Sequence, residues 1–339
     1  MSPTSGRFPV PPVDDRPLYD LRQSKTLASV LTLAQEIGLF EYLAERPATR
    51  RELARHYQVI PRAAEAIVAV AAAAGYLQNC AAEKIALTDL GRTYLLRTSP
   101  FYSEIEPDSE THYELLKEAF YRGDDEDSGK RLAVELGDKS EAEIKDFIDL
   151  MHRLTLPAAG GLARQHIFER IGKLLDVAAG SGSLAAAIAD YNPHIRCTLL
   201  DFAPVCALAR KNIASFGLEA QISTVAADMF CDPWPAGHDA LLFGNIFHDW
   251  DVESCLQLAR NAYEVLEPGG YILLHEMPLN ESRDGPLCVA CFSASMLIFE
   301  KGKQYTLSEF EALLSQAGFV DFHSVPSYGY YHLISARRM

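Results

Sequence analysis

The residues with the clearest capacity for chemistry are glycines and acids that follow predicted strands in the C-terminal half. Segment 173–177 reads as a strand and leads into turn 178–183, which contains Gly180 and Gly182 and precedes a helix. Glycines at such a turn let a ligand approach backbone that Cβ atoms would block. Asp201 ends the next predicted strand, where a carboxylate can accept both ribose hydroxyls of a nucleoside. The pattern therefore predicts a nucleotide-type cofactor site.

This glycine-rich turn alone fits two classes of cofactor. Residues 180–185 also satisfy the dinucleotide fingerprint G-x-G-x-x-A, with an acid at the correct distance. Asp176, at the end of the strand before the glycines, suits an ammonium group and would repel a pyrophosphate. Asp228, after the third strand, is placed to accept a hydrogen bond from an adenine amino group. These acids favour a sulfonium amino-acid nucleoside; the structural alternative is that Asp176 caps a helix and Asp228 caps a turn.

Alternating strands and helices after residue 170 are predicted to position these side chains. Extended runs fit 173–177, 195–200, 222–226, 239–244, 271–276, 319–325 and 330–336, and helices fit 183–190, 204–216, 252–266 and 307–317. This alternation is typical of a parallel sheet with helices on both faces. The last two runs are joined only by residues 326–329, so we expect an antiparallel hairpin at the sheet's edge. The predicted fold is an α/β, Rossmann-like domain with a seven-stranded sheet.

A different, mainly helical pattern precedes this sheet. Residues 1–20 are rich in proline and are interpreted as a flexible arm. Helices are predicted over 25–40, 49–57 and 61–74, followed by short extended pieces at 76–78 and 85–88. Thr49 with Glu52 forms a capping-box pattern, and Pro61 is a favoured first-turn proline. Three helices followed by a two-stranded wing is the order of elements in a winged-helix module.

Winged-helix modules often read DNA, but the third predicted helix lacks the side chains for that role. A reading helix needs Arg, Lys, Asn or Gln at base edges, whereas segment 62–74 is mostly alanine. We therefore expect a dimerisation or scaffold role, with a winged-helix regulator as an alternative. Residues 146–170 are predicted to form a linking helix that Pro157 interrupts, and the acidic run 124–127 is interpreted as a solvated turn.

Composition places the chain among globular proteins. It has 339 residues, 48% of them hydrophobic and 23% charged, with a formal net charge of −15. The acid excess disfavours nucleic-acid and anionic-membrane partners, because a polyanion is repelled on average. The longest apolar run, 66–77, is too short to span a bilayer, and residues 1–20 lack the apolar core of a signal peptide. With seven cysteines in no framework spacing, we expect a cytoplasmic protein with reduced thiols.

Further motifs in the C-terminal half carry a family resemblance. They are Asp176-Val-Ala-Ala-Gly-Ser-Gly182, Leu200-Asp201, Asp228-Met-Phe, Asn245-Ile-Phe-His248-Asp-Trp250-Asp251, Leu266-Glu-Pro-Gly-Gly270, Leu274-His-Glu276 and Lys301-Gly-Lys-Gln-Tyr-Thr306. With them the sequence resembles S-adenosylmethionine (SAM)-dependent small-molecule O-methyltransferases that carry an N-terminal winged-helix dimerisation domain. The resemblance covers roughly residues 25–338, and the His-Asp-Trp-x-Asp element is its most specific part.

The resemblance implies roles for individual residues. His248 is implied as the general base for the acceptor hydroxyl, oriented by Glu276. The implied SAM-binding residues are Asp176, Gly180, Gly182, Asp201, Asp228, Met229 and Asn245. Candidates for the acceptor pocket are His112, Met151, His152, Phe292, Met296 and Gln304. The implied protein is a homodimer that methylates a small aromatic natural product and releases S-adenosylhomocysteine.

The resemblance divides the chain into four segments. They are an arm at 1–20, a winged-helix-like dimerisation domain at 21–100, a helical linker with acceptor-pocket helices at 101–170, and the SAM-binding methyltransferase domain at 171–339.

Two departures from the family pattern leave alternatives open. Ala178 and Ala179 replace glycines of the usual turn, but alanine tolerates extended backbone, so we expect cofactor binding to be kept. Gln304 stands where some members have a second acid, and a neutral amide cannot stabilise an imidazolium as a carboxylate does. Methylation of carbon or nitrogen on the same scaffold therefore stays open, as does a nicotinamide oxidoreductase.

No metal is predicted. Cys288 and Cys291 have a two-residue gap, but no second pair of ligands accompanies them for zinc.

Overall fold

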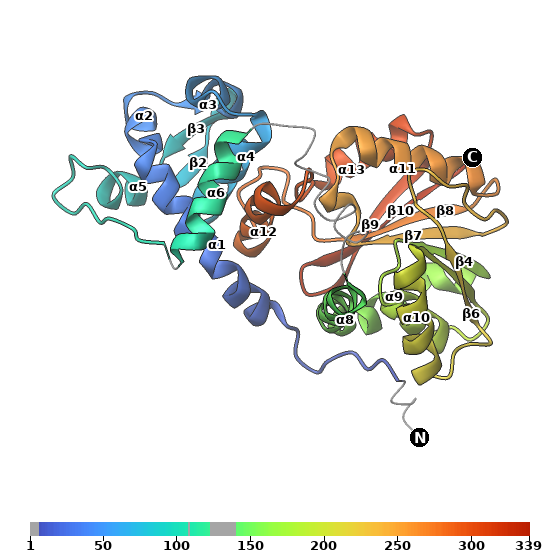
Figure 1. Cartoon of the computed structure of the whole chain (residues 1–339). Coiled ribbons are helices and arrows are strands. Elements are labelled where there is room, and N and C mark those ends of the chain that lie inside the picture. Colours follow the sequence, from blue (N-terminus) through green and yellow to red (C-terminus); the bar gives the residue numbers. More distant parts are fainter. Residues whose placement is uncertain (1–6, 108, 123–139) are drawn as a thin grey trace. The chain divides into compact units, whose positions relative to one another are not determined.

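The structure is a computed structural model that describes residues 7–107, 109–122 and 140–339 (Figure 1). The chain divides into two compact units. The sheet unit comprises Met1–Asp15, Val134–Met277 and Glu309–Met339, and the helical unit comprises Arg16–Ala133 and Pro278–Ser308. This division differs from four consecutive segments, because residues 278–308 pack with the N-terminal half of the chain and residues 7–15 pack with the C-terminal half.

The sheet unit is built on a seven-stranded sheet of order β6-β5-β4-β7-β8-β10-β9. The strands are β4 (Lys173–Val177), β5 (Arg196–Asp201), β6 (Ile222–Ala226), β7 (Ala240–Gly244), β8 (Tyr271–Glu276), β9 (Val320–Tyr328) and β10 (Tyr331–Arg337). Pairing is parallel from β6 to β8, whereas β10 is antiparallel to both β8 and β9. The predicted Rossmann-like fold with its antiparallel last hairpin is confirmed.

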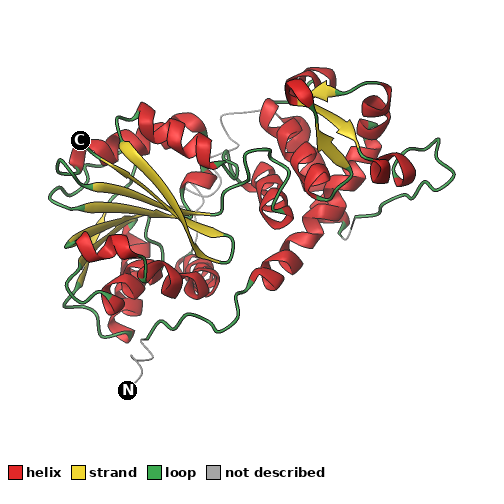
Figure 2. Cartoon of the chain, turned by 180° about the vertical axis from the view of Figure 1, so that it is seen from behind, coloured by secondary structure: helices red, strands yellow, loops and turns green. Residues whose placement is uncertain are grey.

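Helices cover both faces of this sheet (Figures 1 and 2). One layer holds α8 (Glu141–Ala163), α9 (Ser183–Tyr191) and α10 (Ala203–Ser215), and the other holds α11 (Val252–Val265) and α13 (Leu307–Gln316). Because both faces are covered, the central strands are near-continuous apolar runs, as in β7, where residues 240–243 are all buried. Chain order reverses between β4 and β7, and ligands of open α/β sheets bind outside the carboxyl ends of strands at such a switch point.

Two predictions at the start of this unit are wrong. The linking helix is not interrupted, because α8 begins after the Ser140 cap and runs through Pro157 to residue 163. Its C-terminal half is buried against the sheet unit, and this packing offsets the roughly 3 kcal/mol that an interior proline costs. The described part of the arm is also ordered: Phe8 is only 4% exposed and its ring lies 4.8 Å from that of Phe216. The acidic run 124–127 lies outside the described residues.

Two adjacent glycines let other backbone approach α8 closely. A Cβ on Gly160 would lie 2.9 Å from the carbonyl oxygens of Phe8 and Pro9, and one on Gly161 would lie 2.6 Å from that of Ser327 in β9. Backbone atoms cannot move aside as a flexible side chain can. The small residues therefore set how closely the N-terminal segment and the edge hairpin pack on this helix.

Gly161→Ala is expected to destabilise the protein by up to about 2 kcal/mol. Overpacking against the Ser327 carbonyl costs about 1–3 kcal/mol, which exceeds the gain of about 1 kcal/mol from replacing a helical glycine with alanine. Thermal and urea denaturation of the two proteins measure the difference. A variant as stable as the wild type would show that β9 moves away without loss.

The helical unit combines helices with a small antiparallel sheet. Its elements are α1 (Arg16–Glu36), α2 (Leu39–Glu45), β1 (Ala48–Thr49), α3 (Arg50–Tyr57), α4 (Pro61–Ala73), β2 (Leu77–Asn79), β3 (Lys84–Leu87), α5 (Asp89–Tyr94), α6 (Glu110–Arg122) and α12 (Leu287–Phe299). The predicted Thr49–Glu52 capping box is present, and Pro61 opens α4. The three strands form a sheet of order β1-β3-β2. The first helix begins at Arg16, inside the predicted arm.

Helix α12 was not predicted from the sequence. Nearly all its residues are buried, and it packs against α1, α4 and α6, so no polar face marks its period. Cys288 and Cys291 are buried in it, and the described residues hold no group of three or more potential metal ligands. No single described helix is long and apolar enough to cross a membrane, although the bent pair α1 and α2 together meets that test of length and composition.

Candidate active site

A buried histidine–glutamate pair lies at the carboxyl ends of β7 and β8. Because these strands are parallel neighbours, the short turn after β7 and the last residue of β8 meet at one edge. His248 Nδ1 lies 2.6 Å from Glu276 Oε2. Glu276 Oε1 accepts hydrogen bonds from the backbone N–H groups of Ile246 and Phe247, both at 2.9 Å. The carboxylate therefore anchors both the imidazole and the turn that carries it.

Nearby charges and burial shift the pKa of this imidazole in opposite directions. Burial lowers the pKa of His248, but the carboxylates of Glu276 and Asp249 outweigh it and hold the pKa well above its usual value. Asp249 Oδ1 lies 3.2 Å from Nε2, the ring nitrogen opposite Glu276. Sequence reasoning gave Asp249 no role, although it stands inside the His-Asp-Trp-x-Asp element, because the element does not show which way its side chain turns.

Two acids lie at the ends of β4 and β5: Asp176 is buried and Asp201 is half-buried. Asp201 Oδ2 accepts a hydrogen bond from Gly180 N–H at 2.8 Å, and Oδ1 accepts one from Phe202 N–H at 2.7 Å. Burial and the nearby charge of Asp201 raise the pKa of Asp176 to about 8. Burial raises the pKa of Asp201 to about 6, against the lowering effect of its two backbone hydrogen bonds. Neither acid pairs with a cationic side chain among the described residues, and two such acids fit a positively charged ligand and would repel a diphosphate.

The turn between these acids depends on left-handed backbone. Gly180 and Gly182 have φ of 55° and 72°, and a Cβ on Gly182 would lie 2.8 Å from Leu199 Cδ1. Ala178 has φ of 54°. The expectation that alanine here adopts extended backbone is therefore wrong, and Ala178 carries the strain that a glycine would avoid.

Ala178→Gly is expected to stabilise the protein by about 0.5–1 kcal/mol. A left-handed non-glycine residue costs about 1–2 kcal/mol, and the greater freedom of glycine in the unfolded chain cancels part of the gain. Chemical denaturation gives the free energy of unfolding. Ala179→Gly is the matched control, because Ala179 is not left-handed and its replacement adds only unfolded-state freedom. Equal destabilisation by both changes would contradict the assignment of strain.

The remaining predicted cofactor residues lie on loops after β6 and β7. Asp228 is half-buried and its Oδ1 accepts a hydrogen bond from Phe230 N–H at 2.8 Å, so it does cap a turn. The backbone carbonyl of Met229 accepts a hydrogen bond from the Trp234 indole at 3.0 Å. Asn245 is left-handed with φ of 58°, and its N–H donates to the carbonyl of His275, in β8, at 3.1 Å.

The predicted acceptor-pocket residues divide between the two units. His112, Phe292, Met296 and Gln304 belong to the helical unit, and Met151 and His152 belong to the sheet unit. Gln304 is buried, and its backbone N–H donates to Ser293 Oγ at 3.1 Å. His152 Nδ1 lies 2.6 Å from the hydroxyl of Ser183, which opens α9 after the glycine turn. His152 therefore contacts the predicted cofactor loop.

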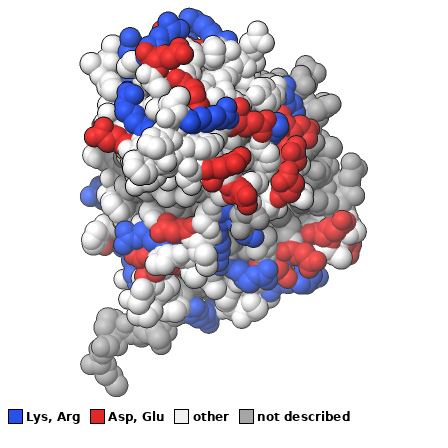
Figure 3. Space-filling model, turned by 90° about the vertical axis from the view of Figure 1, so that its left-hand side faces the viewer, with Lys and Arg blue, Asp and Glu red and all other residues white. Residues whose placement is uncertain are grey.

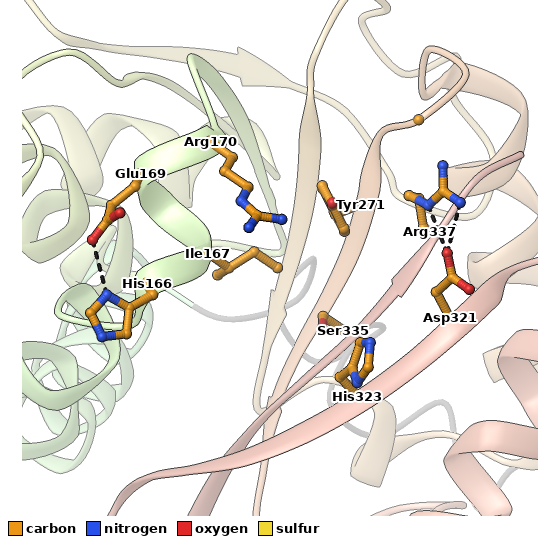
Figure 4. A pocket seen from close by; sticks show the side chains of 10 residues that line it. His166, Ile167, Glu169, Arg170, Tyr271, Asp321, His323, Ser335 and Arg337 are labelled. Carbon is orange, nitrogen blue, oxygen red and sulfur yellow. Dashed lines mark hydrogen bonds and ion pairs between the residues drawn. The ribbon is translucent and has the colours of Figure 1, made fainter.

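A surface hollow of about 700 Å³ lies at the opposite ends of the strands (Figure 4). Tyr271 at the start of β8 and Arg337 at the end of β10 line it, and Arg337 pairs with Asp321 at 2.7 Å. Because β8 ends at Glu276, this hollow is separated from the histidine pair by the length of the strand. We assign it no part in the chemistry.

Comparisons with known proteins agree with this geometry. A family model described as O-methyltransferase domain matches residues 113–320. The chain is 30% identical over 328 residues to 3-hydroxy-5-methyl-1-naphthoate 3-O-methyltransferase from Streptomyces sahachiroi, with 93% of each chain covered. It is 34% identical over 165 residues to L-tyrosine C(3)-methyltransferase from Streptomyces lavendulae, which covers 47% of this chain and 45% of the relative.

Solved structures lead to the same family. An O-methyltransferase family 2 protein from Planctomyces limnophilus, in complex with apigenin, has a TM-score of 0.87 and 26% identity, with 98% of each chain covered. Human N-acetylserotonin methyltransferase in complex with SAM has a TM-score of 0.60 and 25% identity, covering 97% of this chain and 99% of that one. With a family model over more than half its length and a relative 30% identical along 93% of both chains, the protein belongs to the O-methyltransferase family, whose methyl donor is SAM.

Proposed function

We propose that the protein methylates a hydroxyl group of a small aromatic natural product, with His248 as the general base and Glu276 as its orienting carboxylate. The observation that carries this proposal is the buried His248–Glu276 contact of 2.6 Å beside the ends of the strands that present Asp176 and Asp201. That edge of an open α/β sheet is where ligands bind. A buried, oriented imidazole there is suited to removing a proton from an acceptor hydroxyl.

Each residue has a distinct part in this proposal. SAM, when bound, supplies an electrophilic methyl group on a positively charged sulfur, and S-adenosylhomocysteine is its product. Asp201 would accept hydrogen bonds from the ribose hydroxyls, Asp176 would face the ammonium group, and Asp228 would accept from the adenine amino group. Gly180 and Gly182 keep the turn open to the ligand, and Met229 and Asn245 lie on the neighbouring loops.

Proton transfer is the task of the histidine pair. Nε2 of His248 takes the proton of the acceptor hydroxyl as the oxygen attacks. Glu276 holds the Nδ1 proton, which fixes the tautomer, and stabilises the imidazolium that forms. General-base assistance contributes about 10²–10⁴-fold to the rate.

The test is identification of the product. Purified protein, SAM with a ¹³C-labelled methyl group and a panel of hydroxylated aromatic compounds are incubated, and NMR of the product shows whether the label sits on oxygen, carbon or nitrogen. An O-methyl product that disappears with His248→Ala supports the proposal. A C-methyl product that persists with His248→Ala contradicts the base role. Calorimetric titration with SAM and NAD separates a methyltransferase from an oxidoreductase.

Carbon methylation is the second candidate. It is favoured by the similarity to a tyrosine C-methyltransferase and by the neutral amide of Gln304, since an electron-rich ring carbon needs less help from a second carboxylate. The labelled-product experiment distinguishes the two directly.

The proposal extends to assembly and location. We propose that residues 21–100 within the helical unit mediate a homodimer, and that the enzyme works in the cytoplasm without a nucleic-acid or membrane partner. Lys and Arg are interspersed with Asp and Glu over the face drawn in Figure 3, which does not favour binding of a polyanion. Sedimentation analysis tests the dimer, and salt-resistant duplex binding would favour a regulator.

A further inference from the structure

The imidazole of His248 lies between two carboxylates, one on each ring nitrogen. Nδ1 is 2.6 Å from Glu276 Oε2 and Nε2 is 3.2 Å from Asp249 Oδ1. General-base catalysis needs the lone pair of Nε2, the nitrogen not held by Glu276. In this structure, however, Nε2 faces the Asp249 carboxylate, which favours a proton between the two groups.

The two carboxylates are held very differently. The Glu276 side chain is 1% exposed and is tied by two backbone N–H groups, so it cannot leave without breaking the turn. The Asp249 side chain is 21% exposed, and among the described residues His248 is the one polar partner of its carboxylate. Rotation of Asp249 into water therefore breaks a single contact.

We propose that the Asp249 carboxylate controls the protonation of His248 and is displaced when the acceptor binds; we call it a proton gate. Asp249 pairs with Nε2 in the free enzyme. As the acceptor binds, Asp249 carries the Nε2 proton to solvent, and the acceptor hydroxyl takes its position beside Nε2. The inference rests on the proposed role of His248 as the general base. It makes Asp249 a positioning residue that acts through the histidine.

The proton balance closes over one turnover. Departure of protonated Asp249 leaves a neutral imidazole, with its remaining proton on Nδ1 beside Glu276. Methyl transfer forms the oxygen–carbon bond, breaks the sulfur–carbon bond and moves the hydroxyl proton to Nε2. Asp249, having lost its proton to water, then pairs again with the imidazolium. One proton is released for each methyl group transferred.

Asp249→Asn tests this gate. A neutral amide does not stabilise the imidazolium, and an opposite charge within about 4–6 Å shifts a pKa by about 1–3 units. We expect the ¹H–¹⁵N NMR titration midpoint of the His248 ring in the free enzyme to fall by about one unit or more. A lower midpoint means that more of the imidazole is present as free base at acid pH. The acid limb of kcat/KM should therefore move to lower pH by the same amount.

A second readout concerns the carried proton. Asparagine cannot accept it, so kcat on the plateau should fall in Asp249→Asn and be restored in Asp249→Glu. Asp251→Asn is the matched control, because Asp251 is a nearby carboxylate that caps α11 by accepting from Ser254 N–H at 2.8 Å. It should leave the His248 midpoint unchanged.

The outcomes separate the gate from the proposed function. An unchanged midpoint in Asp249→Asn overturns the gate, even if His248→Ala is inactive. Full turnover by His248→Ala overturns the base role, whatever the midpoint does. A midpoint that falls together with the acid limb of kcat/KM, in a protein that needs His248, supports the inference.

Discussion

Replacing His248 with alanine is expected to lower kcat for O-methylation by about 10²–10⁴-fold, the contribution of a positioned general base. The side chain is buried and its Nδ1 contacts Glu276, so the variant removes the imidazole that this carboxylate orients. Steady-state kinetics with a hydroxylated acceptor measure kcat. The Kd for SAM should change little, because Asn245 alone of the implied donor residues follows β7, and the others lie on β4 and β5 or on the loops after β4 and β6.

Controls separate lost chemistry from lost folding. His166→Ala removes an exposed histidine from the hollow of Figure 4, at the opposite ends of the strands, and should leave turnover unchanged. The thermal midpoint of His248→Ala shows whether the variant is folded. A folded His248→Ala protein that keeps wild-type kcat on an O-methylated product would refute the base assignment.

Replacing Asp201 with alanine is expected to raise the Kd for SAM by about 10–100-fold. Hydrogen bonds to a charged group contribute about 1.5–3 kcal/mol, and each 1.4 kcal/mol is tenfold in affinity. Asp201 also holds the glycine turn through Gly180 N–H at 2.8 Å, so its loss loosens the loop as well as removing the ribose acceptor. Isothermal titration calorimetry measures the affinity.

The chain offers a matched control for this change. Asp239 Oδ2 also accepts two backbone hydrogen bonds, from Gly172 and Lys173 at 2.7 Å each, but it does so at the amino end of β4. Asp239→Ala should therefore cost stability without changing SAM affinity. If both variants bind SAM as the wild type does, the donor site is not at the ends of β4 and β5.

The same acids give donor binding a pH dependence. Asp201 and Asp176 have raised pKa values, about 6 and about 8, so they are protonated at pH 5 in the free protein. A cationic ligand favours their ionised forms, so the Kd for SAM should fall as pH rises from 5 to 8. This dependence should weaken in Asp201→Ala, because one of the two titrating groups is gone.

Local patterns in the sequence predicted much of the fold. Three such patterns depend on a backbone preference or a burial pattern that acts over a few residues. They are the mostly apolar runs of β4 and β7, the Thr49–Glu52 capping box and the short link between β9 and β10. The acids predicted to bind the cofactor were singled out because each lies at or just after the end of a strand. His248 and Glu276 were recognised from family motifs, and their 2.6 Å contact agrees with that pairing.

Elements without a local signature were missed. Helix α12 is buried on all sides, so its sequence shows no helical period, and only its packing against α1, α4 and α6 explains it. The continuation of α8 through Pro157 also depends on burial by distant parts of the sheet unit. In both cases contacts remote in sequence decide a conformation that local preference leaves open.

The sequence by itself determined the alternation of strands and helices around the seven-stranded sheet, the glycine turn and which residue types stand at the strand ends, because these follow from periodicity, capping and chain order. Only the tertiary structure decided that Ala178 is left-handed, that Glu276 anchors the turn of His248 by two backbone N–H groups, and that Asp249 faces Nε2. Those features depend on the register of neighbouring strands and on the direction of individual side chains. Long-range packing sets both, and no pattern of residue types encodes them.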